Sequence, residues 1–344
     1  MINRKFHFRI SFLTYYVKAI AIAIIFSKSF AAYTMTPTDS ALEKGYAKIK
    51  VVSELDLSGH TIPQDQLQER LRNFCTKINK EYKRYSWHDS PCGKVDWKAD
   101  LHTAQGHPLI YSAFGEGSNT TLILGGVHPD ELTPIHLSFR LARYLSENPS
   151  IYKGKGLRIV IAPLVNPDGF LIKYPTRTNA ATVDLNRNFL TVDWYADALQ
   201  SWSLRKKIFL RFFPGYFPNS EIETVFQNQL LDKYLPSKIL SIHAPLGFYD
   251  YDGPGDRITK PLKSTEEKAR HLVLRVSEKS NNYKIVDFST FPGSLGKFAG
   301  KQRRVPMLTL ELQTTDPKLV NSYWNQFLPG FIQSIQFEYK WEPL

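Results

Sequence analysis

The chain of 344 residues is 42% hydrophobic and 22% charged, and it contains 19 glycines and 21 prolines. This composition is typical of a globular protein and excludes collagen-like, low-complexity and intrinsically disordered chains. The 44 Lys and Arg against 32 Asp and Glu give a net charge of +12. Such a basic excess is compatible with an anionic partner. Because the sequence contains no nucleic-acid-binding motif, we expect no nucleic-acid partner.

Part of the positive charge lies in residues 1–31, which have the features of a secretory signal peptide. This stretch has basic residues, no acidic residue and the apolar run Ala19–Phe26. Ser29-Phe30-Ala31 follows, with small residues at the two positions that signal peptidase reads. The run is too short for a membrane span, which takes about 20 apolar residues. We therefore expect a periplasmic or secreted protein that is not inserted in a membrane after the signal is removed.

Residues 32–97 are predicted to form a small N-terminal segment. Within it, Gln64–Tyr85 is compatible with a helix, because its large apolar residues recur at spacings of three and four. The two cysteines of the chain, Cys75 and Cys92, also lie here. In an oxidising compartment they favour one disulfide, the alternative being two unrelated buried thiols. The sequence leaves open whether this segment is a propeptide or a permanent part of the protein.

The following residues, 98–344, alternate between apolar segments and helical ones. Thr120–Val127 and Leu157–Val165 are apolar on both faces, as strands are in a sheet covered on both sides. We expect an α/β fold with a mixed, largely buried sheet and helices on both faces. The expected strands are 108–114, 120–127, 157–165, 238–243 and 305–312, and the expected helices are 131–145, 220–235, 264–279 and 317–333. In such folds, ligands bind beyond the carboxyl ends of the strands.

The unusual polar residues of the sequence fall at those strand ends. His128 and Glu131 follow a Gly-Gly pair three residues apart, a spacing that lets an imidazole and a carboxylate converge on a metal such as zinc. Alone the motif is weak, since an acid that caps a helix beside a surface histidine has the same pattern. His243 ends a short strand, and Glu311 lies in an apolar strand where a carboxylate needs a partner or a cleft.

Two loop motifs lie between these residues. Val165-Asn166-Pro167-Asp168-Gly169 has the composition of a turn, and we assign it to the structure of the strand end. Arg177 and the stretch Val183–Phe189, with sequence VDLNRNF, supply two guanidinium groups that suit a carboxylate or a developing oxyanion. A solvated basic loop is the alternative reading. Further on, the basic and aromatic residues 205–213 favour an amphipathic helix that packs its aromatic side chains, the alternative being a surface that contacts an anionic wall polymer or a membrane.

Taken in order, these motifs resemble the zinc carboxypeptidases of the M14 type over about residues 108–312, with VNPDG and VDLNRNF as the most specific parts. The resemblance implies the zinc carboxypeptidase fold and one zinc ion per chain. It implies that His128, Glu131 and His243 are the zinc ligands and that Asp184 orients His128 through its other ring nitrogen. Three protein ligands leave a fourth position for water, as a catalytic zinc site requires.

The same resemblance implies four further roles. Arg177 would polarise the scissile carbonyl and hold the oxyanion, and Asn186 and Arg187 would grip the carboxylate of the substrate. Glu311 would be the general base, which takes a proton from the attacking water and later gives it to the leaving amine. The segments HPDE, HAPLG and Phe291–Gly296 are similar to bacterial murein peptide amidases, which implies a peptidoglycan stem peptide as the substrate.

One departure separates the chain from digestive carboxypeptidases, which carry a mobile tyrosine over the site. The segment before the Glu311 strand contains no tyrosine, and neither Tyr249 nor Tyr251 can be matched to that role. The expected reaction is hydrolysis of the bond between γ-D-glutamate and the diamino acid, or of a neighbouring bond. The main alternative is a general metallocarboxypeptidase that removes C-terminal residues from ordinary peptides. A small-molecule deacylase and an inactive cell-wall-binding protein are weaker alternatives.

Overall fold

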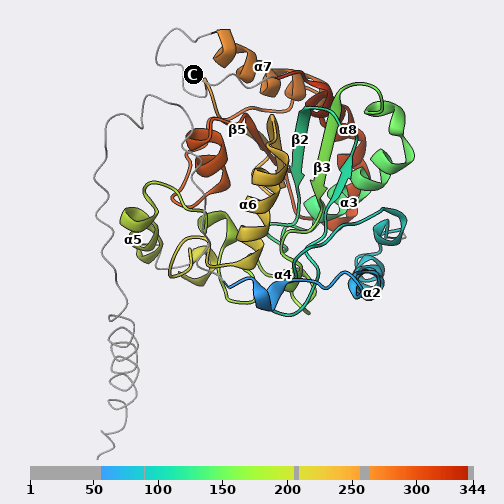
Figure 1. Ribbon diagram of the computed structural model, residues 1–344. Coiled ribbons are helices and arrows are strands. Elements are labelled where there is room, and N and C mark those ends of the chain that lie inside the picture. Colours follow the sequence, from blue (N-terminus) through green and yellow to red (C-terminus); the bar gives the residue numbers. More distant parts are fainter. Residues whose placement is uncertain (1–55, 89, 205–208, 256–263, 340–344) are drawn as a thin grey trace, which may run out of the picture. The chain divides into compact units, whose positions relative to one another are not determined.

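Six strands pair into one mixed sheet in the computed structural model, which describes residues 56–88, 90–204, 209–255 and 264–339 (Figure 1). Their order across the sheet is β1-β3-β2-β4-β6-β5. The four central strands are parallel, while β1 pairs with β3 and β5 pairs with β6 in antiparallel orientation. The strands are β1 (Ser112–Phe114), β2 (Asn119–Leu124), β3 (Leu157–Ala162), β4 (Lys238–His243), β5 (Phe248–Asp252) and β6 (Met307–Glu311).

Helices cover both faces of this sheet, as the sequence predicts. On one face, Ile123 and Leu240 pack in a core with α3 (Leu132–Glu147), α7 (Ser264–Lys279) and α8 (Val320–Gln336). On the other face, Leu122 and Leu124 pack with α6 (Ile222–Tyr234) and with a π-helical turn at Gly296–Gln302. Neighbouring residues of β2 thus face different cores, which explains why this strand is apolar throughout.

The expected elements are present, most of them with changed ends. The strand predicted at 108–114 is shorter, because residues 108–111 form only isolated bridges with residues before them. The helix predicted at 317–333 begins with a 3-10 turn and continues to Gln336. Strand β5 was not predicted, since its sequence FYDYD carries two acids. In the region predicted as an amphipathic helix, residues 205–208 lie outside the described residues, and Phe209–Phe212 forms a 3-10 turn.

The N-terminal helix α2 (Leu67–Arg84) shares a core with the sheet domain. Its Phe74, Ile78 and Tyr82 are buried in the cluster that contains Phe139 of α3. The rings of Tyr82 and Phe139 meet edge to face, with centroids 6.2 Å apart. A disulfide joins Cys75 of α2 to Cys92, as the sequence predicts. The expected signal peptide, residues 1–31, lies outside the described residues.

Candidate metal centre and active site

The chain turns sharply where it leaves β2, and this turn presents the first candidate ligand. Gly126 has φ of +60°, a conformation that favours glycine. A Cβ atom on Gly125 would lie 2.0 Å from Ser138 Oγ of α3, so this position also requires glycine. His128 and Glu131 follow at once, Glu131 immediately before the first residue of α3. Both side chains are buried.

His243 comes from the end of β4, the neighbour of β2 in the sheet. It completes a group of three buried candidate ligands. The Nδ1 atom of His128 lies 2.9 Å from Oε1 of Glu131. The Nδ1 atom of His243 lies 3.0 Å from Oε2 of Glu131 and 3.1 Å from Nδ1 of His128. In the described residues this is the one group of three or more His, Cys, Asp or Glu side chains close enough to hold a metal ion.

The outer ring nitrogens of the two histidines have partners of their own. Nε2 of His128 lies 3.0 Å from Oδ1 of Asp184, and Nε2 of His243 lies 2.9 Å from the Ser241 hydroxyl. Burial would raise the pKa of Asp184, but the charges of Arg177 and His128 hold it well below its usual range. Asp184 is therefore an ionised acceptor. It binds the Nε2–H tautomer of His128 and leaves the Nδ1 lone pair for a metal.

These contacts fit a zinc ion. Two imidazole lone pairs cannot face each other at hydrogen-bond distance unless a proton or a cation lies between them. Zn–N and Zn–O bonds of about 2.0–2.1 Å in tetrahedral geometry place ligand atoms roughly 3.4 Å apart. The separations among the two Nδ1 atoms and the two carboxylate oxygens of Glu131 are 2.9–3.1 Å, somewhat shorter than that value. Two nitrogens and one carboxylate are also a donor set that zinc prefers.

Arg177 is fixed beside this cluster by two carboxylates. Its Nε donates to Oδ2 of Asp184 at 2.8 Å, and its Nη1 donates to Oε1 of Glu131 at 3.3 Å. Its side chain is only 11% exposed. Burial favours the neutral guanidine, but the charges of Asp184 and Glu131 outweigh it and raise the pKa of Arg177. The guanidinium is thus a rigid cation at the edge of the cluster of candidate metal ligands.

Glu311 reaches the site from the end of β6. It is the direct partner of His243 across the parallel pair of β4 and β6. Its Oε2 accepts a hydrogen bond from the Leu246 N–H at 3.4 Å. Burial raises the pKa of Glu311, an effect that the nearby His243 partly opposes. Glu311 is half-buried, so its side chain is not sealed in the core.

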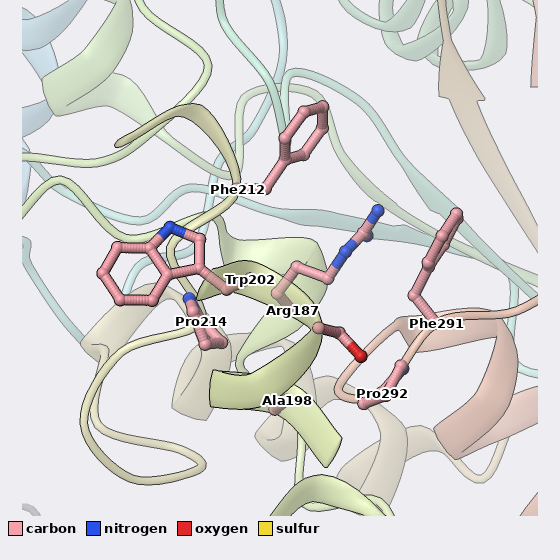
Figure 2. A pocket seen from close by; sticks show the side chains of 8 residues that line it. Arg187, Ala198, Trp202, Phe212, Pro214, Phe291 and Pro292 are labelled. Atoms are coloured by element: carbon pink, nitrogen blue, oxygen red, sulfur yellow. The ribbon is translucent and has the colours of Figure 1, made fainter. Parts of the chain in front are cut away.

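Asn186 and Arg187 lie in a 3-10 turn, Leu185–Arg187, that follows Asp184. Oδ1 of Asn186 accepts from the Leu295 N–H at 2.8 Å, which directs the amide NH₂ group the other way. The guanidinium carbon of Arg187 lies 4.2 Å from the centroid of the Phe291 ring. Figure 2 shows Arg187 pointing between Phe212 and Phe291 at a small pocket, which is also lined by Trp202.

The structure thus places all eight predicted site residues at the carboxyl edge of the central strands. The sequence reading missed Asn188, which is fully buried. Its Nδ2 donates to the Pro214 and Phe217 carbonyls at 2.9 and 3.1 Å and so holds the chain segment that borders the pocket. Its place in the NRNF stretch, directly before the apolar Phe189, is the one signal in the sequence that could have revealed it.

Asp168 and the two tyrosines considered in the sequence have structural roles outside the site. Asp168 of the NPDG stretch is buried and has a structural role, because it accepts from the Gln105 N–H at 3.2 Å and from His107 Nδ1 at 2.8 Å. Tyr249 and Tyr251 point into the core. Their hydroxyls bond Ser280 and the Pro254 carbonyl at 2.9 and 2.8 Å, so neither tyrosine reaches the site.

Comparison with known families agrees with this geometry. The model of the zinc carboxypeptidase family of M14 peptidases matches residues 83–329. The chain belongs to this family. It is therefore a hydrolase of the zinc metallocarboxypeptidase type, and His128, Glu131 and His243 form the group that can hold its ion. No helix in the described part of the chain is both long and apolar enough to cross a membrane.

Curated relatives of this zinc carboxypeptidase are similar over parts of the chain. Murein peptide amidase A of Escherichia coli K12 is 33% identical over 144 residues, which are 41% of this chain and 56% of that protein. The enzyme of the same name from Vibrio campbellii is 29% identical over 239 residues, or 68% of this chain and 84% of that protein. Bovine thrombin-activatable fibrinolysis inhibitor has the same fold, with a TM-score of 0.57 at 16% identity over 80% of this chain and 96% of its own.

Proposed function

We propose that this zinc carboxypeptidase is an exported enzyme that hydrolyses an amide bond of peptidoglycan stem peptides. The bond would join γ-D-glutamate to the diamino acid, or be a neighbouring one. The observation that carries the proposal is the position of Glu311, which lies beside His243 at a cluster of three buried ligands. The names of the relatives, both murein peptide amidases, supply the class of substrate.

In the proposed reaction, each side chain acts at a position that the fold gives it. Zinc, when bound by His128, Glu131 and His243, supplies Lewis-acid polarisation of a carbonyl and makes water more acidic. Glu311 takes the proton from the attacking water and passes it to the leaving amine, a role for which a raised pKa is suited. Arg177, already fixed by Asp184, holds the negative charge that develops on the carbonyl oxygen.

Asn186 and Arg187 would bind the carboxylate of the leaving amino acid. An amide NH₂ and a guanidinium both donate to carboxylates, and a guanidinium does so with two parallel hydrogen bonds. The bond from Leu295 N to Asn186 fixes the orientation of the amide before substrate arrives. Orientation in advance lowers the entropic cost of binding a substrate in a reactive position.

We also propose that residues 1–31 are a signal peptide, which would deliver the enzyme to the periplasm or beyond. Residues 32–97 would stay with the catalytic domain, residues 98–344, after export. In support, Tyr82 and Trp87 both pack on His136 of α3, with ring centroids 5.6 and 4.9 Å away. Removing this segment would expose the core side of the helix that follows Glu131.

The test is mass spectrometry of a defined set of muropeptides after incubation with the zinc-loaded protein. The set contains tri-, tetra- and pentapeptide stems, and a library of ordinary L-peptides is treated in parallel. Loss of the terminal diamino acid from tripeptide stems, with the L-peptides intact, is the expected result. Trimming of the L-peptides with all stems intact would overturn the proposal in favour of a general metallocarboxypeptidase.

A further inference from the structure

The aromatic ring of Phe212 contacts both arginines of the candidate site. Its centroid lies 4.9 Å from the guanidinium carbon of Arg177 and 5.7 Å from that of Arg187. A cation within about 6 Å of a ring centroid is attracted by the negative potential of the ring face. One apolar side chain therefore touches the arginine expected at the oxyanion and the arginine expected at the substrate carboxylate.

The short segment that carries this ring, residues 210–213, is tied at two points to residues that adjoin the candidate metal ligands. Arg211 Nη1 donates to the carboxylate of Asp130, the residue directly before the candidate ligand Glu131. The carbonyl of Phe213 accepts from the N–H of Asp184 at 2.8 Å. Because these bonds flank Phe212 on both sides in the sequence, they fix the ring with respect to His128, Glu131 and Asp184.

Packing behind the segment gives it a rigid base. Phe213 is buried, and its ring lies 4.7 Å from that of Trp202 and 5.1 Å from that of Tyr216, measured between centroids. Phe291 provides a second ring for Arg187, on the opposite border of the pocket in Figure 2. An aromatic face attracts a guanidinium without engaging the N–H donors that lie in the plane of the group, whereas a carboxylate would engage them.

We propose that Phe212 is a positioning residue, which adds one shared contact to Arg177, already held by Asp184 and Glu131, and to Arg187, and so helps to set the place of both guanidinium groups relative to the candidate metal ligands. The inference rests on the proposed function, because it assigns Arg177 to the oxyanion and Arg187 to the carboxylate of the leaving residue. Loss of the ring then affects two steps. Substrate binding weakens through Arg187, which raises KM, and the transition state loses stabilisation through Arg177, which lowers kcat.

The kinetic test compares Phe212→Leu with Phe212→Tyr on a tripeptide stem whose terminal carboxylate is either free or amidated. Phe212→Leu is expected to lower kcat/KM for the free acid about 2- to 30-fold, the range that a cation–π contact supplies. It should also reduce the preference of the enzyme for the free acid over the amide. Phe212→Tyr keeps the ring face and is expected to preserve that preference.

A second readout does not depend on activity. The guanidinium NMR signals of Arg177 and Arg187 are expected to carry ring-current shifts that Phe212→Leu removes and Phe212→Tyr retains. Trp324→Leu is the matched control. The guanidinium carbon of Arg140 lies 4.5 Å from the centroid of the Trp324 ring, and neither residue is one of the candidate site residues. This variant should move only the Arg140 signal and leave the kinetics unchanged.

The outcomes separate this inference from the proposed function. Unchanged arginine signals in Phe212→Leu, or changed signals with wild-type kcat and KM on both stems, would overturn the positioning role. If the wild-type protein cleaves no stem, the proposed function fails. In that case the NMR signals still test whether Phe212 contacts the two arginines, because they do not depend on activity.

Discussion

His243 and Glu311 are directly opposed residues of the neighbouring parallel strands β4 and β6. Adjacent strands lie about 4.8 Å apart, and opposed side chains share one face of the sheet. The sheet itself therefore fixes the separation between a candidate metal ligand and the candidate general base. A change of register by one residue would point Glu311 into the opposite core.

This arrangement predicts that metal binding and proton transfer can be separated by mutation. Glu311→Gln is expected to bind one zinc per chain as the wild-type protein does, because Glu311 is outside the group of clustered ligands. Glu131→Ala and His243→Ala, which each remove a ligand, should lose the ion during dialysis. Metal content measured by plasma mass spectrometry checks both expectations. Loss of zinc from Glu311→Gln would place this carboxylate among the ligands and contradict the assignment.

Asp184→Asn should weaken the metal site without removing a ligand. Asp184 selects the tautomer of His128 and also holds Arg177, and an amide serves both partners less well. Loss of such an outer partner typically costs about 10- to 100-fold in metal affinity. Competition for zinc with a chelator measures the change. Ser241→Ala, which removes the partner of His243, is the companion variant. Wild-type zinc affinity in Asp184→Asn would refute this role.

The disulfide predicts a stability effect that can be measured without substrate. The bond closes a loop with a sequence separation of 17 residues. A loop of that length stabilises the folded state by about 3 kcal/mol in the chain-entropy model. The Cys75→Ser/Cys92→Ser double variant should therefore melt about 5–10 °C lower. An unchanged melting temperature would show that packing of α2 alone holds this region.

Glu223 predicts a pH dependence of stability. Burial raises its pKa from an ordinary 4.5 to about 8, although Asn179 donates a hydrogen bond to it at 3.1 Å. The folded state then binds a proton more tightly than the unfolded state between these two values. Its contribution to stability is complete below pH 4.5 and is lost as the pH rises through 8.

The variant Glu223→Gln removes this titration. Its melting temperature, relative to that of the wild-type protein, should rise as the pH increases from 4.5 to 8. Glu221→Gln is a suitable control, because Asn179 also donates to Glu221 at 2.7 Å but no fully buried carboxylate is removed. Parallel melting curves for Glu223→Gln and the wild-type protein across this range would contradict the prediction.

Much of the fold could be predicted because its strands are buried on both faces. The strand at 238–243 and the helix at 264–279 have the predicted ends. Strand β5 could not be found, because its acids, Asp250 and Asp252, alternate with aromatic residues in a segment that reads as a loop. Its place at the sheet edge is decided by pairing with β6, a long-range contact that no local pattern encodes.

Four candidate site residues could be picked out because His128 and Glu131 follow a glycine turn and His243 and Glu311 end strands. The other four, Arg177, Asp184, Asn186 and Arg187, lie in loops and a short turn, and only the order of the motifs, which resembles a known family, pointed to them. The partners of these residues could not. That Asn186 would be held by Leu295, and Arg187 flanked by Phe291, depends on contacts across more than a hundred residues. Phe212 lies in a basic and aromatic run whose pattern predicts an amphipathic helix and gives no sign of a contact with Arg177 or Arg187.

The most direct test of the central claim is hydrolysis of a tripeptide stem in water labelled with ¹⁸O by the zinc-loaded protein. The account predicts that one labelled oxygen enters the γ-carboxylate of the released glutamyl product and none enters the diamino acid. It also predicts that Glu311→Gln lowers this rate by about 10²- to 10⁴-fold. Unlabelled or uncleaved stems with the wild-type protein, or full activity in Glu311→Gln, would contradict the account.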